Sequence, residues 1–214
     1  MPRKKSRLNE AQIIEAVYSL MDHYNYHEIT VDMIAEKAGL SKRTLYSYYP
    51  SKDAIFALLY EGFLKELYDT LLDLEKTELY NEEIICAIFE TLNSFSEKNR
   101  KYHKLLWFIQ TNELGFQIPD EIAEHIAIWN ESIHRLNERI IEARVVSGFF
   151  STVSVDLLSQ MLSVVNKGII MQGGRSKVAV GFDAPSAGEM REFFCALFRA
   201  VGKTEENRTF DKTP

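Results

Sequence analysis

Residues 42–48 carry side chains suited to contacting duplex DNA. Their order, Lys-Arg-Thr-Leu-Tyr-Ser-Tyr, sets two cations, hydroxyl groups and aromatic rings around one aliphatic residue, Leu45. In a helix, Leu45 would point into a core while the others face outward, toward the base edges and phosphate oxygens of a major groove. The predicted DNA-contact residues are Thr30, Ser41, Lys42, Arg43, Thr44, Tyr46, Ser47, Tyr48 and Lys52.

The flanking residues predict the two helices that would hold this stretch in place. Thr30 can cap a first helix whose apolar residues Ile34 and Ala38 share a face. Gly39 then supplies the backbone freedom that a sharp turn needs, and Ser41 caps the next helix. Two short helices joined in this way are typical of a helix-turn-helix.

Side-chain chemistry suggests different roles within the contact set. The forked guanidinium of Arg43 suits a guanine edge, whereas Lys42 can reach either a base or a phosphate. The hydroxyl groups suit phosphate oxygens, as does Lys52 together with the amide groups that open the following helix. For any single residue an ordinary solvated position remains the alternative, but it is disfavoured for the cluster. Tyr49 is predicted to pack beneath Leu45.

The stretch from Ser41 to Tyr49, followed by Ser51, Lys52 and a helix from near Asp53, resembles the signature of the TetR family of bacterial transcriptional regulators. The shared pattern is a small capping residue, a threonine three positions on, Leu-Tyr-x-Tyr-aromatic and a lysine. The resemblance implies an all-α fold of about nine helices: a three-helix DNA-binding head, a long fourth helix and a helical body. The implied domains are 1–52 for the basic arm and head, continuing into a linking helix at 53–74, and 75–214 for effector binding and dimerisation.

Composition and charge agree with an ordinary globular protein that has a basic end. The 214 residues are 46% hydrophobic, which is enough for one substantial core or two smaller ones. The net charge is -6, yet residues 1–52 hold eight Lys/Arg against six Asp/Glu. Such a distribution orients the molecule in the field of DNA phosphates. No apolar run has the length of a membrane span and no signal peptide is seen, so a soluble cytoplasmic protein without a membrane partner is expected.

Cysteine, histidine and other residues that often form redox, metal or catalytic sites are not spaced in this sequence as such sites require. Cys86 and Cys195 lie in apolar surroundings without a C-x-x-C spacing, so buried reduced thiols are favoured over a disulfide or a redox switch. His103, His125 and His134 show no metal-ligand pairing, and no metal or cofactor is predicted. An enzyme is disfavoured because a nucleophile elbow and a dinucleotide-binding glycine fingerprint are both missing from the sequence.

Helical periodicity runs through most of the chain, and no sustained alternation indicates a sheet. Besides the two short helices, the pattern predicts one after Asn9, one from Ser51 to about Leu74, one through Ile84 to Phe95, one around 102–113, one from Pro119 to about Arg144, one over 153–171 and a last one over about 186–202.

The last two predicted helices are candidates for a dimer interface. Apolar residues cover more than one face of the first, and phenylalanines line one side of the second, so two helices from each subunit would form a four-helix interface. The predicted interface residues are Leu158, Leu162, Val165, Met190, Phe193, Phe194, Leu197 and Phe198. Burial of both helices within one subunit is the alternative, and the family resemblance favours the dimer.

The resemblance also implies an effector pocket in the body. Aromatic and soft side chains could line it, and an apolar small molecule is the expected effector. The candidates are Phe89, Phe95, His103, Trp107, Phe108, Trp129 and Met161, although plain core positions remain the alternative for each.

The function expected from these features is that of a homodimeric repressor. It would bind a palindromic operator in double-stranded DNA and be released by a small-molecule ligand. The alternative is a DNA-binding regulator without such a ligand, controlled by a protein partner. A non-specific architectural protein is disfavoured because only a short arm is basic.

Overall fold

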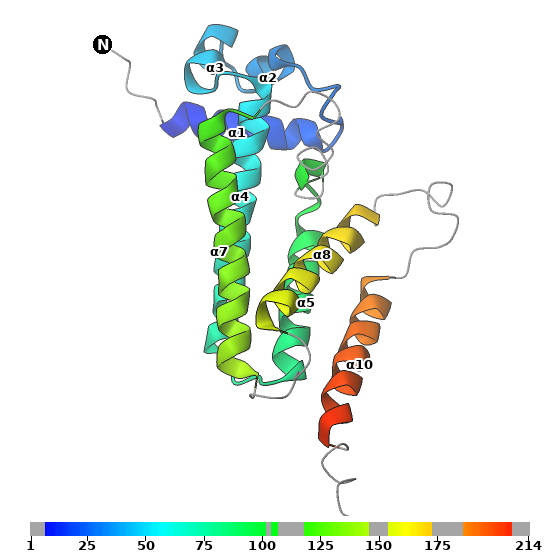
Figure 1. Ribbon diagram of the computed structural model, residues 1–214. Helices are drawn as coiled ribbons and strands as arrows, with labels where there is room; N and C mark the ends of the chain where they lie inside the picture. The colour runs from blue at the N-terminus through cyan, green and yellow to red at the C-terminus, as the bar shows by residue number, and fades with distance from the viewer. Residues whose placement is uncertain (1–6, 102–103, 107–117, 146–153, 173–185, 207–214) are drawn as a thin grey trace, which may run out of the picture. The chain divides into compact units, whose positions relative to one another are not determined.

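The chain folds into helices, as shown by a computed structural model that describes residues 7–101, 104–106, 118–145, 154–172 and 186–206 (Figure 1). Within these ranges there is no strand, which confirms the all-α prediction. The elements are α1 (Arg7–Met21), α2 (Val31–Lys37), α3 (Lys42–Tyr48), α4 (Lys52–Leu72), the 3-10 turn η1 (Asp73–Lys76), α5 (Glu82–Lys98), α7 (Asp120–Arg144), α8 (Val155–Gln172) and α10 (Ala187–Glu206).

Most helix boundaries follow the predicted ones because the signals that set them are local. The Ser51 hydroxyl accepts a hydrogen bond from the Ala54 amide at 3.0 Å and so caps α4. Helix α7 begins directly after Pro119, as predicted. Helix α1 begins at Arg7, slightly before the predicted cap at Asn9. The helix predicted around 102–113 lies mostly outside the described residues.

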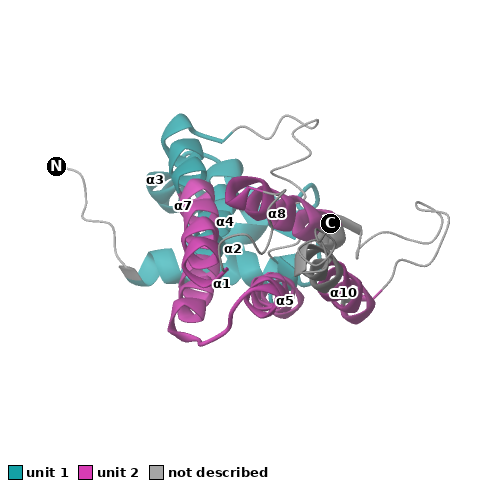
Figure 2. Ribbon diagram, turned by 60° about the horizontal axis from the view of Figure 1, so that its bottom comes forward, with its two compact units in different colours: residues 1–64, 99–128 teal, residues 65–98, 129–214 magenta. Residues whose placement is uncertain are grey.

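Two compact units make up the chain (Figure 2). Residues 1–64 and 99–128 form unit 1, and residues 65–98 and 129–214 form unit 2. The predicted division into a head, a linking helix and a body is a functional one and stays a prediction. Among the described helices, none combines the length and the apolar character needed to traverse a lipid bilayer.

The core of unit 1 is built from one face of each of its first four helices. Fully buried side chains come from α1 (Ile13), α2 (Ile34), α3 (Leu45) and α4 (Phe56). Burial of apolar surface of this kind supplies most of the free energy that holds short helices together. Tyr24 lies outside this core and is exposed, because α1 has already ended at Met21.

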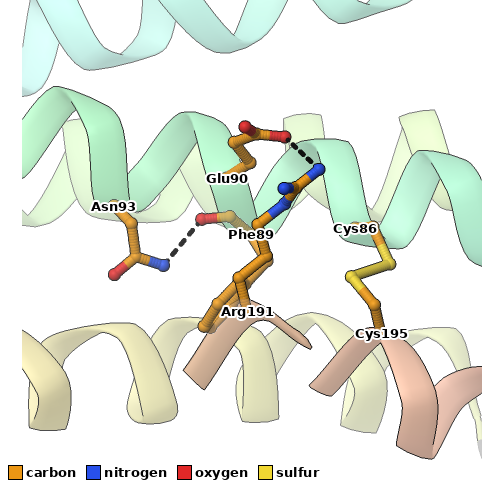
Figure 3. The surroundings of a disulfide bond; sticks show 6 residues. All are labelled: Cys86, Phe89, Glu90, Asn93, Arg191 and Cys195. Carbon is orange, nitrogen blue, oxygen red and sulfur yellow. Dashed lines mark hydrogen bonds and ion pairs between the residues drawn. A yellow bond between two sulfur atoms is a disulfide. The ribbon is translucent and has the colours of Figure 1, made fainter. Parts of the chain in front are cut away.

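The core of unit 2 is organised around α5. Its apolar residues recur at helical spacing, and all six predicted ones are buried: Ile84, Ile85, Ile88, Phe89, Leu92 and Phe95. Helix α10 packs against this face, where the rings of Phe89 and Phe194 lie 5.1 Å apart, and Arg191 pairs with Glu90 at 3.1 Å (Figure 3).

A disulfide joins α5 to α10, which corrects the prediction of two reduced thiols. Cys86 and Cys195 are bonded to each other although 109 positions separate them in sequence (Figure 3). Their Cα atoms lie 5.6 Å apart, within the usual range for a disulfide. This pair cannot be seen in the sequence because only the packing of α10 on α5 brings the two side chains together.

Candidate nucleic-acid interface

Both short helices of the predicted helix-turn-helix are capped by hydroxyl side chains. The Thr30 hydroxyl accepts a hydrogen bond from the Met33 amide at 3.2 Å, and the Ser41 hydroxyl accepts one from the Thr44 amide at 3.1 Å. Each cap satisfies an amide that the first turn of a helix leaves unpaired. Thr30 and Ser41 thus act first as structural residues, and both are exposed at the surface.

The turn between α2 and α3 depends on Gly39. Its φ of +66° lies in the left-handed region, which side chains with a Cβ atom rarely adopt. The Leu40 amide donates to the Ala35 carbonyl at 2.9 Å and the Gly39 amide donates to the Glu36 carbonyl at 3.0 Å. These bonds close the end of α2 and redirect the chain into α3, as the sequence predicted.

Helix α3 presents a buried side and an exposed side. Leu45 is fully buried, and Tyr49, at the end of the helix, is buried as well, as predicted. Lys42, Arg43 and Tyr46 are exposed. The remaining contact candidates are mixed, since Ser47 is exposed whereas Thr44 and Tyr48 are half-buried. Cationic and hydrogen-bonding side chains thus share the outer surface of a helix whose inner surface is anchored.

Tyr49 also ties the end of α3 to α1. Its hydroxyl donates to the Glu10 carboxylate at 3.4 Å. Burial, with the neighbouring Glu10 carboxylate, raises the pKa of Tyr49 above its ordinary range, so the phenol stays protonated as a donor. The contact helps to hold the exposed side of α3 in one orientation.

Several polar groups of this surface already have partners within the protein. Lys42 pairs with Asp32 at 2.5 Å, but both side chains are more than half exposed, so a phosphate can compete for the ammonium group. The Ser47 hydroxyl donates to the Thr44 carbonyl at 2.6 Å, and the Ser41 and Thr44 hydroxyls are 2.9 Å apart. Donation from Ser47 to a phosphate therefore requires its hydroxyl to rotate.

Lys52, the last of the predicted contact residues, has partners within the protein. Its ammonium group donates to the carbonyls of Tyr26 at 2.9 Å and Ile29 at 3.0 Å, and it lies 3.9 Å from the centre of the Tyr26 ring. Burial lowers the pKa of Lys52. Tyr26 in turn bonds to Asp53 and contacts the ring of Phe56 edge-on at 5.0 Å. Lys52 thus braces the loop between α1 and α2, and the predicted phosphate contact at this residue stays a prediction.

Lys52→Met is therefore expected to lower the free energy of unfolding of the protein by about 1–3 kcal/mol, because two carbonyls lose a charged donor. The matched variant Lys42→Met removes the same charge from an exposed ion pair and should cost less than about 1 kcal/mol. Urea denaturation followed by circular dichroism measures both. Equal losses of stability in the two variants would show that Lys52 is an ordinary surface lysine.

The predicted effector-binding residues lie in different environments and do not form one group. Phe89 and Phe95 are buried in the core of unit 2. Trp129 is half-buried, with its ring 5.7 Å from that of Tyr68 and Lys65 over its face. Met161 is 50% exposed, which contradicts a position inside a closed pocket of this chain. His103, Trp107 and Phe108 lie outside the described residues.

The predicted dimer residues separate into buried and exposed groups. Leu158 and Leu162 are buried within the chain and cannot form a surface, which corrects their assignment. Val165, Met190 and Phe194 are half-buried, Phe193 and Leu197 are exposed, and the side chain of Phe198 is not described. Leu157 and Val164 were not among the predicted residues, and with Met161 they give α8 an exposed apolar face. Sequence alone could not tell which of its apolar faces the core would use.

A capped helix, a left-handed glycine turn and a second helix with a basic outer surface define the N-terminal part as a helix-turn-helix of the DNA-binding type. Residues 13–59, which span most of α1 and end within α4, match the model of the bacterial regulatory proteins of the tetR family. The helix-turn-helix of this chain is therefore that of the TetR family. Its members are regulatory proteins rather than enzymes, in agreement with the prediction that this chain is no enzyme.

Individual relatives agree with this assignment. The nucleoid occlusion factor SlmA of Glaesserella parasuis is 26% identical over 107 residues, which cover 50% of this chain and 53% of SlmA. This chain thus spans about half the length of the SlmA relatives that it matches. The HTH-type transcriptional regulator BetI of Vibrio vulnificus is 22% identical over 179 residues, covering 78% of this chain and 81% of BetI. A tetR-family regulatory protein from Rhodococcus RHA1 shares the fold, with a TM-score of 0.68 at 13% identity over 92% of this chain and 97% of that one.

Proposed function

We propose that this protein is a sequence-specific DNA-binding transcriptional regulator that acts as a homodimer in the cytoplasm, where its DNA lies. The observation that carries the proposal is the outer surface of α3, where Lys42, Arg43 and Tyr46 are exposed. These side chains follow a capped N-terminus and surround an anchored Leu45, so the helix that carries them is held in place before DNA binds. Such preorganised donors suit the edges of bases in a major groove.

A dimer follows from the size of this surface. One seven-residue helix contacts too few base pairs to distinguish an operator from the rest of a genome, so such heads act in pairs on palindromic sites. Exposed apolar side chains on α8 and α10 support a pairing surface in unit 2. These exposed residues are Leu157, Met161, Val164, Phe193 and Leu197. Apolar patches of this kind commonly mark an interface between subunits.

Selection of bound duplexes from a random pool tests the proposal, and a palindromic consensus is the expected result. With that consensus, Arg43→Ala should weaken specific binding by about 1–3 kcal/mol and relax the preference at one base pair per half-site. The reason is the loss of a guanidinium that can bind a guanine through two hydrogen bonds. Titration of fluorescent duplexes that differ at single positions measures both effects.

Lys37→Ala is the matched control for Arg43→Ala. Lys37 is an exposed cation in the last turn of α2, outside the predicted contact set. Its removal should weaken binding to all duplexes alike, through the general attraction between cations and phosphates. If Arg43→Ala also weakened all duplexes equally, Arg43 would contact the DNA backbone instead of a base.

Release of the operator by a small molecule is the second part of the proposal. Within the described ranges, three buried side-chain atoms without a hydrogen-bond partner support it: Ser96 Oγ on α5, Asn137 Oδ1 on α7 and Asn166 Oδ1 on α8, all in unit 2. Buried polar atoms rarely remain unpaired, and ligand groups or water can supply the missing bonds. Because the two amide oxygens are acceptors, an effector that meets them carries hydrogen-bond donors as well as apolar surface.

The alternative proposal is control by a protein partner without a small molecule. The relative SlmA is named a nucleoid occlusion factor, whereas BetI is named a transcriptional regulator, so chains similar to this one carry different roles. A compound that raises the melting temperature and displaces the operator would favour ligand control. Repression, as opposed to activation, is the expectation for either mode and is tested by a reporter gene placed behind the selected operator.

A further inference from the structure

A histidine and two carboxylates converge on the surface of unit 2, outside both the DNA-contact surface and the apolar pairing face. His134 and Glu138 are separated by one turn of α7, and Asp156 lies in the first turn of α8. The Nε2 atom of His134 is 3.1 Å from Asp156 Oδ1 and 3.7 Å from Glu138 Oε1. One ligand atom from each of the three lies within 4.8 Å of the other two.

Ser159 holds the imidazole in place from the buried side. Its hydroxyl oxygen lies 3.0 Å from His134 Nδ1 and 3.3 Å from the His134 carbonyl oxygen, to which it can donate its proton. When the Ser159 hydroxyl donates to this carbonyl, its oxygen is free to accept a hydrogen bond from Nδ1–H of His134. The proton of the ring is then on Nδ1, so Nε2 carries a lone pair that points toward the carboxylates. Fixing the far nitrogen of a histidine in this way is typical of histidines that bind metals. Gln160 similarly fixes Asp156, donating to Oδ1 at 2.8 Å.

The charge of the two carboxylates is not balanced by nearby arginines. Arg135 is paired with Glu131 at 2.7 Å and Arg139 with Glu75 at 2.6 Å. In the part of the chain that the structure describes, neither Glu138 nor Asp156 pairs with a lysine or an arginine. Two anionic groups beside an imidazole lone pair form an arrangement that a bound cation stabilises.

We propose that His134 Nε2, Glu138 and Asp156 bind a divalent transition-metal ion of the Zn²⁺ type. Zinc bonds to nitrogen and carboxylate oxygen are about 2.0–2.2 Å long, which places neighbouring tetrahedral ligands roughly 3.3–3.6 Å apart. The distances from Nε2 to the two carboxylates, 3.1 and 3.7 Å, bracket this range. A nitrogen ligand favours such an ion over Mg²⁺ or Ca²⁺, which prefer oxygen alone. The sequence shows only the His134 and Glu138 spacing, and a single pair of this kind predicts no metal site without a third ligand.

Bound metal would link α7 to the first turn of α8. The apolar face of α8 begins at the next residue, Leu157, so the ion would hold in place one end of the proposed pairing surface. Water would complete the coordination, because Asp156 is exposed and the other two ligands are half-buried. The inference stands on these residues and does not require the DNA-binding proposal.

Titration of chelator-treated, untagged full-length protein with Co²⁺, followed by its visible absorption, tests the site, and competition with Zn²⁺ gives the preference. We expect one ion per chain and at least a tenfold loss of affinity in both His134→Ala and Asp156→Asn. The second variant is nearly isosteric, which limits damage to the fold, and circular dichroism checks both. His125→Ala is the matched control, because His125 faces one carboxylate, Glu61, at 3.8 Å.

The proposal is overturned if no cobalt absorption develops, or if it persists unchanged in His134→Ala. Equal loss in His125→Ala would likewise overturn it, since the metal would then bind surface histidines without a built site. If hydrogen bonds alone hold the cluster together, neither the parent protein nor any of the three variants will bind Co²⁺ or Zn²⁺.

Discussion

Phe193→Glu is expected to convert the dimer into a monomer and to abolish specific operator binding. Phe193 is 61% exposed on α10, one turn from the exposed Leu197. A carboxylate at this position would have to lose its hydration in an apolar interface without gaining a partner, at a cost of several kcal/mol. Because a single head cannot hold a palindromic site, loss of the dimer removes specific binding as well. Analytical ultracentrifugation and titration with operator duplex measure the two losses.

Ile128→Glu is the matched control for this variant. Ile128 is 54% exposed on α7, so the same change of charge is made on a helix outside the proposed interface, and the dimer should persist. Phe194, the neighbouring residue of the predicted interface, is less suitable for this test because it is half-buried against Phe89. A dimeric Phe193→Glu protein would show that subunits do not pair through α10.

Reduction of the disulfide is expected to lower the free energy of unfolding by about 2–5 kcal/mol. The bond between Cys86 and Cys195 closes a long loop, with 109 positions between its ends, and so removes many conformations from the unfolded chain. Denaturation in guanidinium with and without a reductant measures the difference. Alkylation followed by mass spectrometry should detect no reactive thiol until the reductant is added, even in denaturant.

The variant with both Cys86→Ser and Cys195→Ser is the control for reduction. Its stability should not respond to the reductant and should equal that of the reduced parent protein. If the parent protein already has two reactive thiols in denaturant without reductant, the cysteines are not bonded in the purified protein. The original expectation of reduced thiols, which are the rule in a cytoplasm, would then hold.

The residues of the sequence determined most of the features that depend on near neighbours in the chain. Thr30 and Ser41 cap the helices that follow them, and Gly39 supplies the left-handed turn. A cap joins atoms three residues apart, and the periodicity of α5 extends over a few turns, so both can be seen in a short stretch of sequence. For the same reason the sequence identified Leu45 as buried and the residues around it as a surface.

Only the tertiary structure decided the features that join distant segments. It paired Cys86 with Cys195, placed Lys52 against the carbonyls of the loop between α1 and α2, and brought Asp156 to His134. The tertiary structure also determines which apolar side of α8 is buried. The physical reason is that helical periodicity shows that a side chain lies on a face, but the neighbouring helices determine whether that face is covered.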